Sequence, residues 1–72
     1  MMIPLTEMEL VRVNSLEDVR IIAGGLIDLG VYFEVMPLPD EWWEIRTRAE
    51  GHLIRVGVDP GRVVKPQKAT SF

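Results

Sequence analysis

Few side chains of the chain have the types and spacing that catalysis requires. His52 is the single histidine, and an acid–base role requires further groups positioned around it. Asp40, Glu41 and Glu44 lie close together around a turn signal and offer carboxylates for a cation or for an acid–base pair. Acidic residues in turns are, however, commonly solvated turn formers. We therefore predict a protein that is not an enzyme, with no catalytic residue and no metal site.

The glycine-rich stretch GGLIDLG at 24–30 lacks the arrangement of a phosphate-binding loop. Its glycines fall within an expected helix, whereas such loops lie between a strand and a helix. The chain also has no cysteine, which removes disulfides and thiolate metal ligands. We expect no cofactor.

The stretch PDEWWEIRTR at 39–48 places two tryptophans side by side. In a strand, neighbouring side chains point to opposite faces, so one indole enters the core and the other points outward. Ile45 shares a face with Trp43, which predicts that Trp43 is the buried one. Trp42 then lies on an outward face rich in residue types that are enriched at protein interfaces. The candidate partner-binding residues on this face are Tyr32, Met36, Trp42, Arg46 and Arg48.

The composition of the outward face also fits roles other than protein binding. Its residues can pack across the strands, with Tyr32 or Met36 over the Trp42 ring, or the C-terminal part of the chain can fold across it. A single-stranded nucleic acid is another candidate partner, since aromatic and basic side chains on an open sheet stack bases and pair with phosphates. The acidic total and the carboxylates of Glu34 and Glu44 on the same face disfavour it, because phosphate binding needs a positive potential.

The first elements that position these residues follow from periodicity and capping signals. MELVRV at 8–13 alternates as a strand does. Ser15 followed by Asp18 predicts the start of a helix over 16–29, and Gly30 predicts its end.

Two glycines, Gly24 and Gly25, fall in the middle of this helix. Each costs roughly 1 kcal/mol relative to alanine in a helix interior. We expect the cost to be offset by close approach of the helix to the sheet or to a neighbouring chain, or else the helix bends or breaks there.

A hairpin is expected next. A second strand over 31–36 should end at Pro37 and Pro39, which cannot donate to a ladder. The turn signal that begins at Pro39 leads into a third strand over 42–48.

The remainder gives a weaker pattern and completes the fold class. LIRVGV at 53–58 fits a fourth strand or a short helix, and RVVKP at 62–66 fits a short edge strand. We predict one α+β domain over 1–66 and a flexible tail over 67–72. In this small β-α-β-β(-β) domain, one helix packs on one face of a mixed three- to four-stranded sheet. With the third strand between the first two, the topology is that of half of a ferredoxin-like fold.

Size and charge favour association. A chain of 72 residues buries only roughly 60% of its unfolded surface, and without disulfides or a metal it is expected to gain stability by binding itself or a partner. The net charge is −3, with nine acidic residues and two arginines in 1–44, and six basic and two acidic residues in 45–72. This asymmetry indicates a two-signed surface or head-to-tail self-association, unless the signs intermix on folding.

The function that these features favour is protein binding. We predict a small, acidic, cytoplasmic regulator or inhibitor that docks its aromatic and arginine face onto a partner protein or its own copy. A homodimer through the Gly24-Gly25 side of the helix fits equally well, and single-stranded nucleic-acid binding is the alternative. The cytoplasm is expected because the chain lacks cysteine and a basic signal-like N-terminus. No apolar run is long enough to span a bilayer.

Overall fold

The structure is a computed structural model that describes residues 8–48 and 51–65. The expected tail over 67–72 and the domain boundary at residue 66 lie outside these described residues. None of the helices in the described segments has the length and apolar character of a bilayer-spanning segment.

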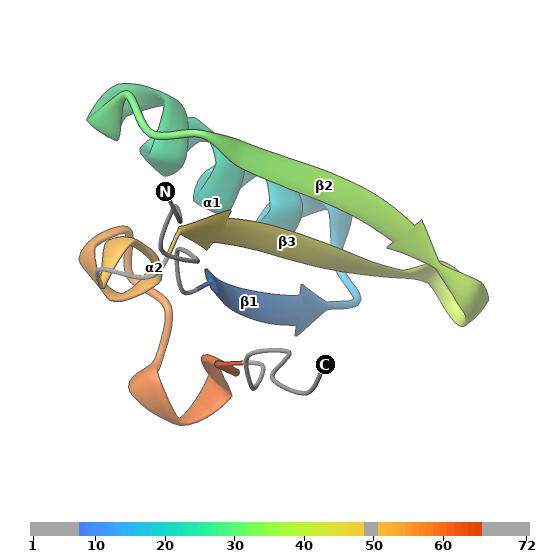
Figure 1. The fold of residues 1–72 in the computed structure, drawn as a ribbon. Coiled ribbons are helices and arrows are strands. Elements are labelled where there is room, and N and C mark those ends of the chain that lie inside the picture. The colour runs from blue at the N-terminus through green and yellow to red at the C-terminus, as the bar shows by residue number, and fades with distance from the viewer. Residues whose placement is uncertain (1–7, 49–50, 66–72) are drawn as a thin grey trace, which may run out of the picture.

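The sheet has three strands, in the order β1-β3-β2 (Figure 1). β1 is Met8–Val13, β2 is Phe33–Leu38 and β3 is Trp42–Arg48, and β3 pairs antiparallel with both neighbours. The α+β class is therefore confirmed, but the sheet is antiparallel where the sequence suggested a mixed one. The likeness to half of a ferredoxin-like fold stays a prediction.

The helix α1, Leu16–Leu29, has the bounds that the capping signals predicted. The Ser15 side chain accepts a hydrogen bond from the backbone N–H of Asp18 at 3.3 Å, which satisfies a helix-terminal donor. Gly30 ends the helix in the left-handed region with φ 74°, and its N–H donates to the carbonyls of Leu26 and Ile27.

The two central glycines of α1 have different surroundings. A Cβ on Gly25 would lie 2.7 Å from Cγ1 of Val56, so glycine is required here because α1 closely approaches the residue that ends α2. A Cβ on Gly24 would meet nothing within 4 Å. The helix is continuous through both positions, so the glycines do not break it.

The second strand begins and ends two residues later than the sequence predicted. β2 includes Pro37, which pairs in register with Trp43. Proline is tolerated here because β2 is an edge strand of the described sheet and has a ladder only with β3. Proline therefore does not end this strand, contrary to the prediction for 31–36.

The turn between β2 and β3 consists of Pro39–Glu41. Asp40 and Glu41 both have positive φ, at 63° and 64°, a conformation that costs energy for residues with a side chain. Leu38 pairs with Trp42 across the base of this turn. The backbone of the turn thus determines the position of Trp42, the first residue of β3.

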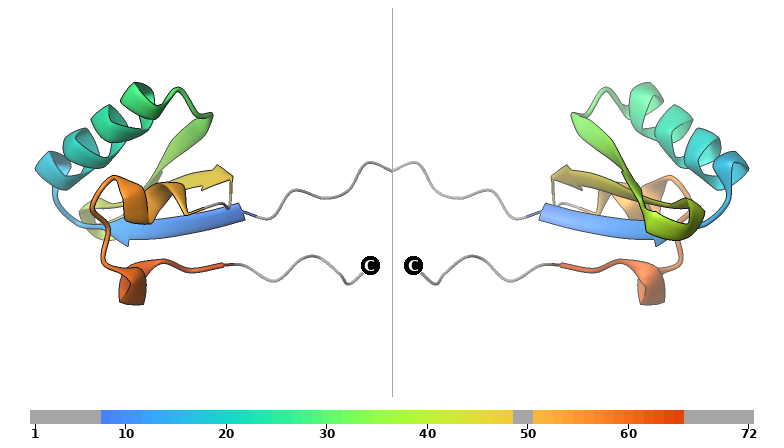
Figure 2. Two further views of the ribbon diagram at one scale, coloured as in Figure 1. Left: turned by 90° about the vertical axis from the view of Figure 1, so that its left-hand side faces the viewer. Right: turned by 90° about the vertical axis from the view of Figure 1, so that its right-hand side faces the viewer.

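The C-terminal part forms no fourth strand in the described residues. His52–Arg55 is a short helix, α2, so the helical alternative for 53–58 is the correct one over its first residues. The expected edge strand at 62–66 is reduced to one bridge, in which Leu10 and Val64 exchange two backbone hydrogen bonds of 2.8 Å. In the side views, α1 lies on one side of the sheet and residues 60–65 run beside β1 (Figure 2).

The core lies between the sheet, α1 and α2. Each element contributes fully or nearly buried aliphatic side chains: Val11, Val13, Val19, Ile22, Leu26, Ile45, Leu53 and Val58. α1 lies mainly over β1 and β3. Val35 of β2 is therefore 38% exposed although it lies on the helix side of the sheet.

One carboxylate is buried on this side of the sheet. Glu9 of β1 is 1% exposed, and its Oε1 accepts a hydrogen bond of 3.0 Å from the backbone N–H of Leu53. A buried carboxylate must be hydrogen-bonded to be tolerated. Glu9 therefore fixes the start of α2 against β1.

Candidate functional site

The neighbouring tryptophans have opposite environments, as the alternation predicted. Trp43 is partly buried and packs against the core cluster. Trp42 is 39% exposed and belongs to the other face of the sheet. One indole thus packs against the core, while the other is partly accessible.

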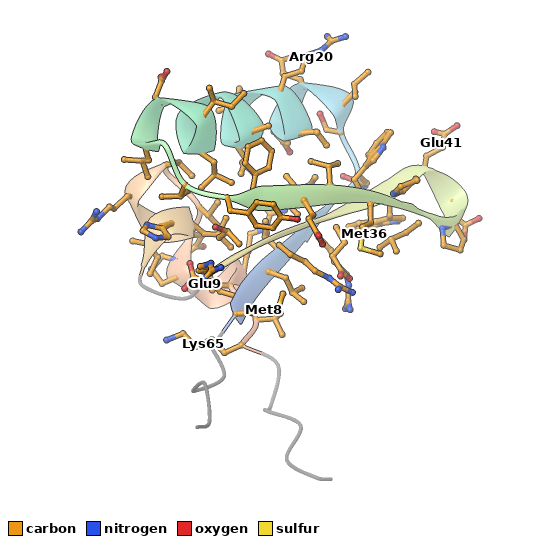
Figure 3. The ribbon with its side chains drawn as sticks, turned by 45° about the horizontal axis from the view of Figure 1, so that its top comes forward. Met8, Glu9, Arg20, Met36, Glu41 and Lys65 are labelled. Atoms are coloured by element: carbon orange, nitrogen blue, oxygen red, sulfur yellow. The ribbon has the colours of Figure 1, made fainter. Side chains whose placement is uncertain are left out.

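We call this second face the outer sheet face. It carries the side chains that alternate away from α1 on the three strands. Met8 and Met36 are seen on this side of the sheet in Figure 3. The strand residues of the face are Met8, Leu10, Arg12, Glu34, Met36, Leu38, Trp42, Glu44, Arg46 and Arg48.

The centre of the outer sheet face is an ion-pair cluster around Glu44. Its side chain is 4% exposed. Arg12 Nε donates to Oε1 at 3.0 Å, and Arg46 Nε donates to Oε2. The hydrogen bond from Arg46, and then that from Arg12, lowers the pKa of Glu44 below its ordinary 4.5, against the opposing effect of desolvation. This carboxylate therefore stays ionised and holds both guanidinium groups over the sheet.

A hollow of about 340 Å³ lies at one end of the outer sheet face. It lies where β1 begins and β3 ends, since Met8 and Arg48 are paired across those strands. Its lining combines two guanidinium groups, a carboxylate, a phenol, a hydroxyl and a thioether, from Met8, Tyr32, Glu34, Arg46, Thr47 and Arg48. The lining can therefore form both apolar contacts and charge-assisted hydrogen bonds.

Tyr32 forms one wall of this hollow and is fixed at both ends. Its hydroxyl donates to Glu34 Oε2 at 2.7 Å, and its backbone carbonyl accepts from Thr47 Oγ1 at 2.8 Å. The hydrogen bond to Glu34 and the charge of that carboxylate raise the pKa of the Tyr32 phenol. Tyr32 is 65% exposed, so an ordered aromatic side chain is available to a partner.

The five residues proposed from the sequence fall into two groups on the outer sheet face. Tyr32, Arg46 and Arg48 line the hollow together. Met36 and Trp42 lie toward the hairpin turn, where Met36 pairs in register with Glu44 and Trp42 with Leu38. Glu44 lies between Trp42 and Arg46 along β3, and Arg46 belongs both to the hollow and to the ion-pair cluster.

Some contributors to the face were not singled out from the sequence. Glu34 and Glu44 were predicted to lie on the face only as charges that disfavour nucleic acid, and Met8 and Thr47 were not among the predicted site residues. The pairing Arg12↔Glu44 depends on the strand register, which a one-residue slip would change completely. The alternation of Glu44 and Arg46 with apolar residues indicated that both side chains lie on the outer sheet face. It did not indicate which residues of the neighbouring strands they contact.

The groups considered for catalysis come from different parts of the fold. Within residues 8–48 and 51–65, no three histidine, cysteine or acidic side chains come together as metal ligands would. Asp40 and Glu41 are both exposed in the hairpin turn, where Glu41 is labelled in Figure 3, while Glu44 faces Arg12 and Arg46. His52 begins α2 on the opposite side of the sheet.

Comparison of the chain with protein-family models, with curated proteins and with solved structures finds no match.

Proposed function

We propose that this protein is a non-enzymatic protein-binding module that docks its outer sheet face onto a partner protein, as a regulator or inhibitor does. The single observation that carries the proposal is the separation of the tryptophans, with Trp43 against the core and Trp42 39% exposed. A large aromatic side chain that the core does not use, on a face that also carries arginines, has the composition of a binding hot spot.

The arrangement of the face supports a partner with two kinds of contact. Near the hairpin, Trp42, Leu38 and Met36 offer apolar area. At the other end, the hollow offers the Arg46 and Arg48 guanidinium groups beside the Tyr32 phenol and the Glu34 carboxylate, which suit polar contacts. The partner that fits is therefore a protein surface or segment with both an apolar side chain and polar ones.

The charge balance supports protein over single-stranded nucleic acid. Arg12 and Arg46 are both paired with Glu44, and Glu34 adds a second carboxylate to the lining of the hollow. Phosphate binding depends on uncompensated positive charge. If the protein instead binds single-stranded nucleic acid, its affinity for the nucleic acid should fall steeply as the salt concentration rises.

A photo-crosslinking experiment tests the proposal. A benzophenone side chain introduced at position 42, and separately at position 32, is activated in cells of the native host, and crosslinked products are identified by mass. We expect the same partner protein from both positions, since Tyr32 and Trp42 share the outer sheet face. Nucleic-acid products would support the alternative instead.

The matched control is position 55. Arg55 is exposed on α2, whose Leu53 belongs to the core on the helix side of the sheet. No crosslink to the same partner is expected from this position. A partner captured equally from 42 and 55, or from 55 alone, would show that the outer sheet face is not the docking surface.

The cytoplasm is part of the same proposal. The absence of cysteine supports it, because disulfides are rare in that compartment. Localisation of the tagged chain in the native host by fluorescence tests it.

A further inference from the structure

A second accessible surface lies on the opposite side of the molecule, on α1. Residues spaced by three and four along a helix share a face, and one such face of α1 points away from the sheet. Arg20 is seen pointing in this direction in Figure 3. Its members are exposed, and we call it the outer helix face: Glu17, Arg20, Ile21, Gly24, Ile27 and Asp28.

The apolar members of the outer helix face are unusually accessible. Ile21 is 59% exposed and Ile27 is 64% exposed. They lie on either side of Gly24, three residues before it and three after it. Gly24 contacts no group beyond its own helix that would exclude a side chain, in contrast to Gly25 beside Val56. No contact within the described chain therefore requires the unfavourable mid-helix glycine at 24.

Gly24 belongs to a row of residues on α1 that can pack against the same row on a second copy of the chain. Arg20, Gly24 and Asp28 are spaced by four and form one ridge, and packing of such ridges side by side is the commonest way in which helices cross. Each charged residue lies about 6 Å from Gly24 along the helix axis. In an antiparallel pair with Gly24 at the twofold axis, Arg20 therefore lies at the level of Asp28 of the partner subunit.

The charges of the ridge are available for this pairing. Among the described residues, neither Arg20 nor Asp28 has an ion pair or a side-chain hydrogen bond. A twofold interface must be self-complementary, because each contact occurs twice. One basic and one acidic residue at equal distances from a glycine meet this requirement, and a small residue at the crossing point allows close approach of the two backbones.

We infer that the outer helix face of α1 is a homodimer interface, in which the α1 helices of two copies cross antiparallel at Gly24. Ile21 and Ile27 flank the crossing point, and Arg20 pairs with Asp28 of the partner subunit on both sides of the axis. The outer sheet face lies on the other side of the sheet and stays open, so the dimer presents two copies of it.

Sedimentation equilibrium of the full chain over a concentration series tests the dimer. The wild type is expected to reach twice the 8.2 kDa mass of one chain. Gly24→Gln places a good helix-forming side chain at the crossing point, so the variant should stay folded by circular dichroism and dissociate at least tenfold more readily. Ile54→Gln is the matched control, since Ile54 is an exposed apolar residue on α2, and its mass should equal that of the wild type.

A charge exchange tests the antiparallel register. Arg20→Asp and Asp28→Arg should each weaken self-association at least tenfold, because like charges then face each other. Their equimolar mixture should form heterodimers, and the double variant should dimerise as the wild type does. Both substitutions suit the helix dipole, with the acid nearer the N-terminus and the base nearer the C-terminus, so loss of folding is not expected.

The contrary results are distinct. A wild type that remains monomeric at about 1 mM, a dimer that persists in Gly24→Gln, or a mixture that does not recover association would overturn the inferred interface. Trp42→Ala should still sediment as a dimer. Loss of the dimer in that variant would place self-association on the outer sheet face instead.

Discussion

The same kinds of side chain have different environments on the two faces of the sheet. Each face receives one tryptophan from β3 and one buried carboxylate. On the helix side, Trp43 packs against the core and Glu9 bonds the backbone N–H of Leu53. On the outer side, Trp42 is 39% exposed and Glu44 binds two arginines.

We propose that the two faces have different roles. A carboxylate that bonds a backbone N–H fixes one element against another and stabilises the fold. A carboxylate that holds two guanidinium groups organises side chains on an accessible surface, because Arg12 remains 56% exposed and Arg46 37% exposed. We interpret the helix side as the source of folding stability and the outer sheet face as a prearranged docking surface.

The largest expected contrast comes from the tryptophans. Trp43→Ala should reduce the free energy of unfolding by about 3 kcal/mol, since it removes an aromatic side chain that packs against the core. Trp42→Ala should cost less, about 1 kcal/mol, because Trp42 is 39% exposed and lies outside the core cluster. Urea unfolding followed by far-ultraviolet circular dichroism measures both. Equal losses would show that the two faces do not differ in this way.

A smaller effect is expected at Glu44. Glu44→Gln should cost about 2 kcal/mol at neutral pH, because two charge-assisted hydrogen bonds lose their ionised acceptor. The folded-state pKa of Glu44 is lowered from its ordinary 4.5. The ionised carboxylate therefore contributes stability above that value, and the contribution is lost as the pH falls through the lower folded-state pKa.

Unfolding of the wild type and of Glu44→Gln across a pH series measures this contribution. The difference in stability between them should be largest near neutral pH and should shrink on the acid side of about pH 4.5. A difference that stays constant with pH would mean that the ion pairs do not stabilise the folded state.

A link between the faces is expected at Thr47. Thr47→Val keeps the shape of a side chain that is 3% exposed but removes its 2.8 Å hydrogen bond to the Tyr32 carbonyl. The loss should be about 1 kcal/mol, and the Tyr32 resonances should shift in NMR spectra. Thr47→Ser keeps the hydroxyl and should preserve the position of Tyr32. If the Tyr32 signals are unchanged in Thr47→Val, the core does not position this wall of the hollow.

The smallest expected effect is a gain of stability at the hairpin turn. Glu41 has φ 64°, and glycine adopts this conformation without the steric cost of a Cβ. Glu41→Gly should therefore raise the free energy of unfolding by about 0.5 kcal/mol, after the greater flexibility of glycine in the unfolded chain is counted. Thermal unfolding measures it, and a clear loss would indicate that the Glu41 side chain has a stabilising contact.

Local signals in the sequence predicted much of this fold. The cap at Ser15 and the glycine at 30 gave the bounds of α1, and alternation gave β1, β3 and the two environments of the tryptophans. The bounds of β2 were wrong because an edge strand can contain Pro37. The short apolar run after residue 52 fits a helix as well as a strand, and only packing against Glu9 and the core decides between them.

The candidate site was less accessible to such reasoning. Alternation places a side chain on a face but does not give its partner across the strands. The Arg12–Glu44–Arg46 cluster requires the register of two separate ladders. The hollow beside Tyr32 forms only when the strands are assembled, because its lining comes from all three strands and Thr47 holds the Tyr32 backbone there.

The affinity of the crosslinked partner for Trp42→Ala, measured by calorimetric titration beside the wild type and Arg55→Ala, tests the docking surface most directly. We predict that Trp42→Ala, which stays folded, binds at least about thirtyfold more weakly, as loss of a hot-spot residue does, while Arg55→Ala binds as the wild type does. Unchanged affinity of the folded Trp42→Ala variant would contradict the assignment of the outer sheet face as the docking surface.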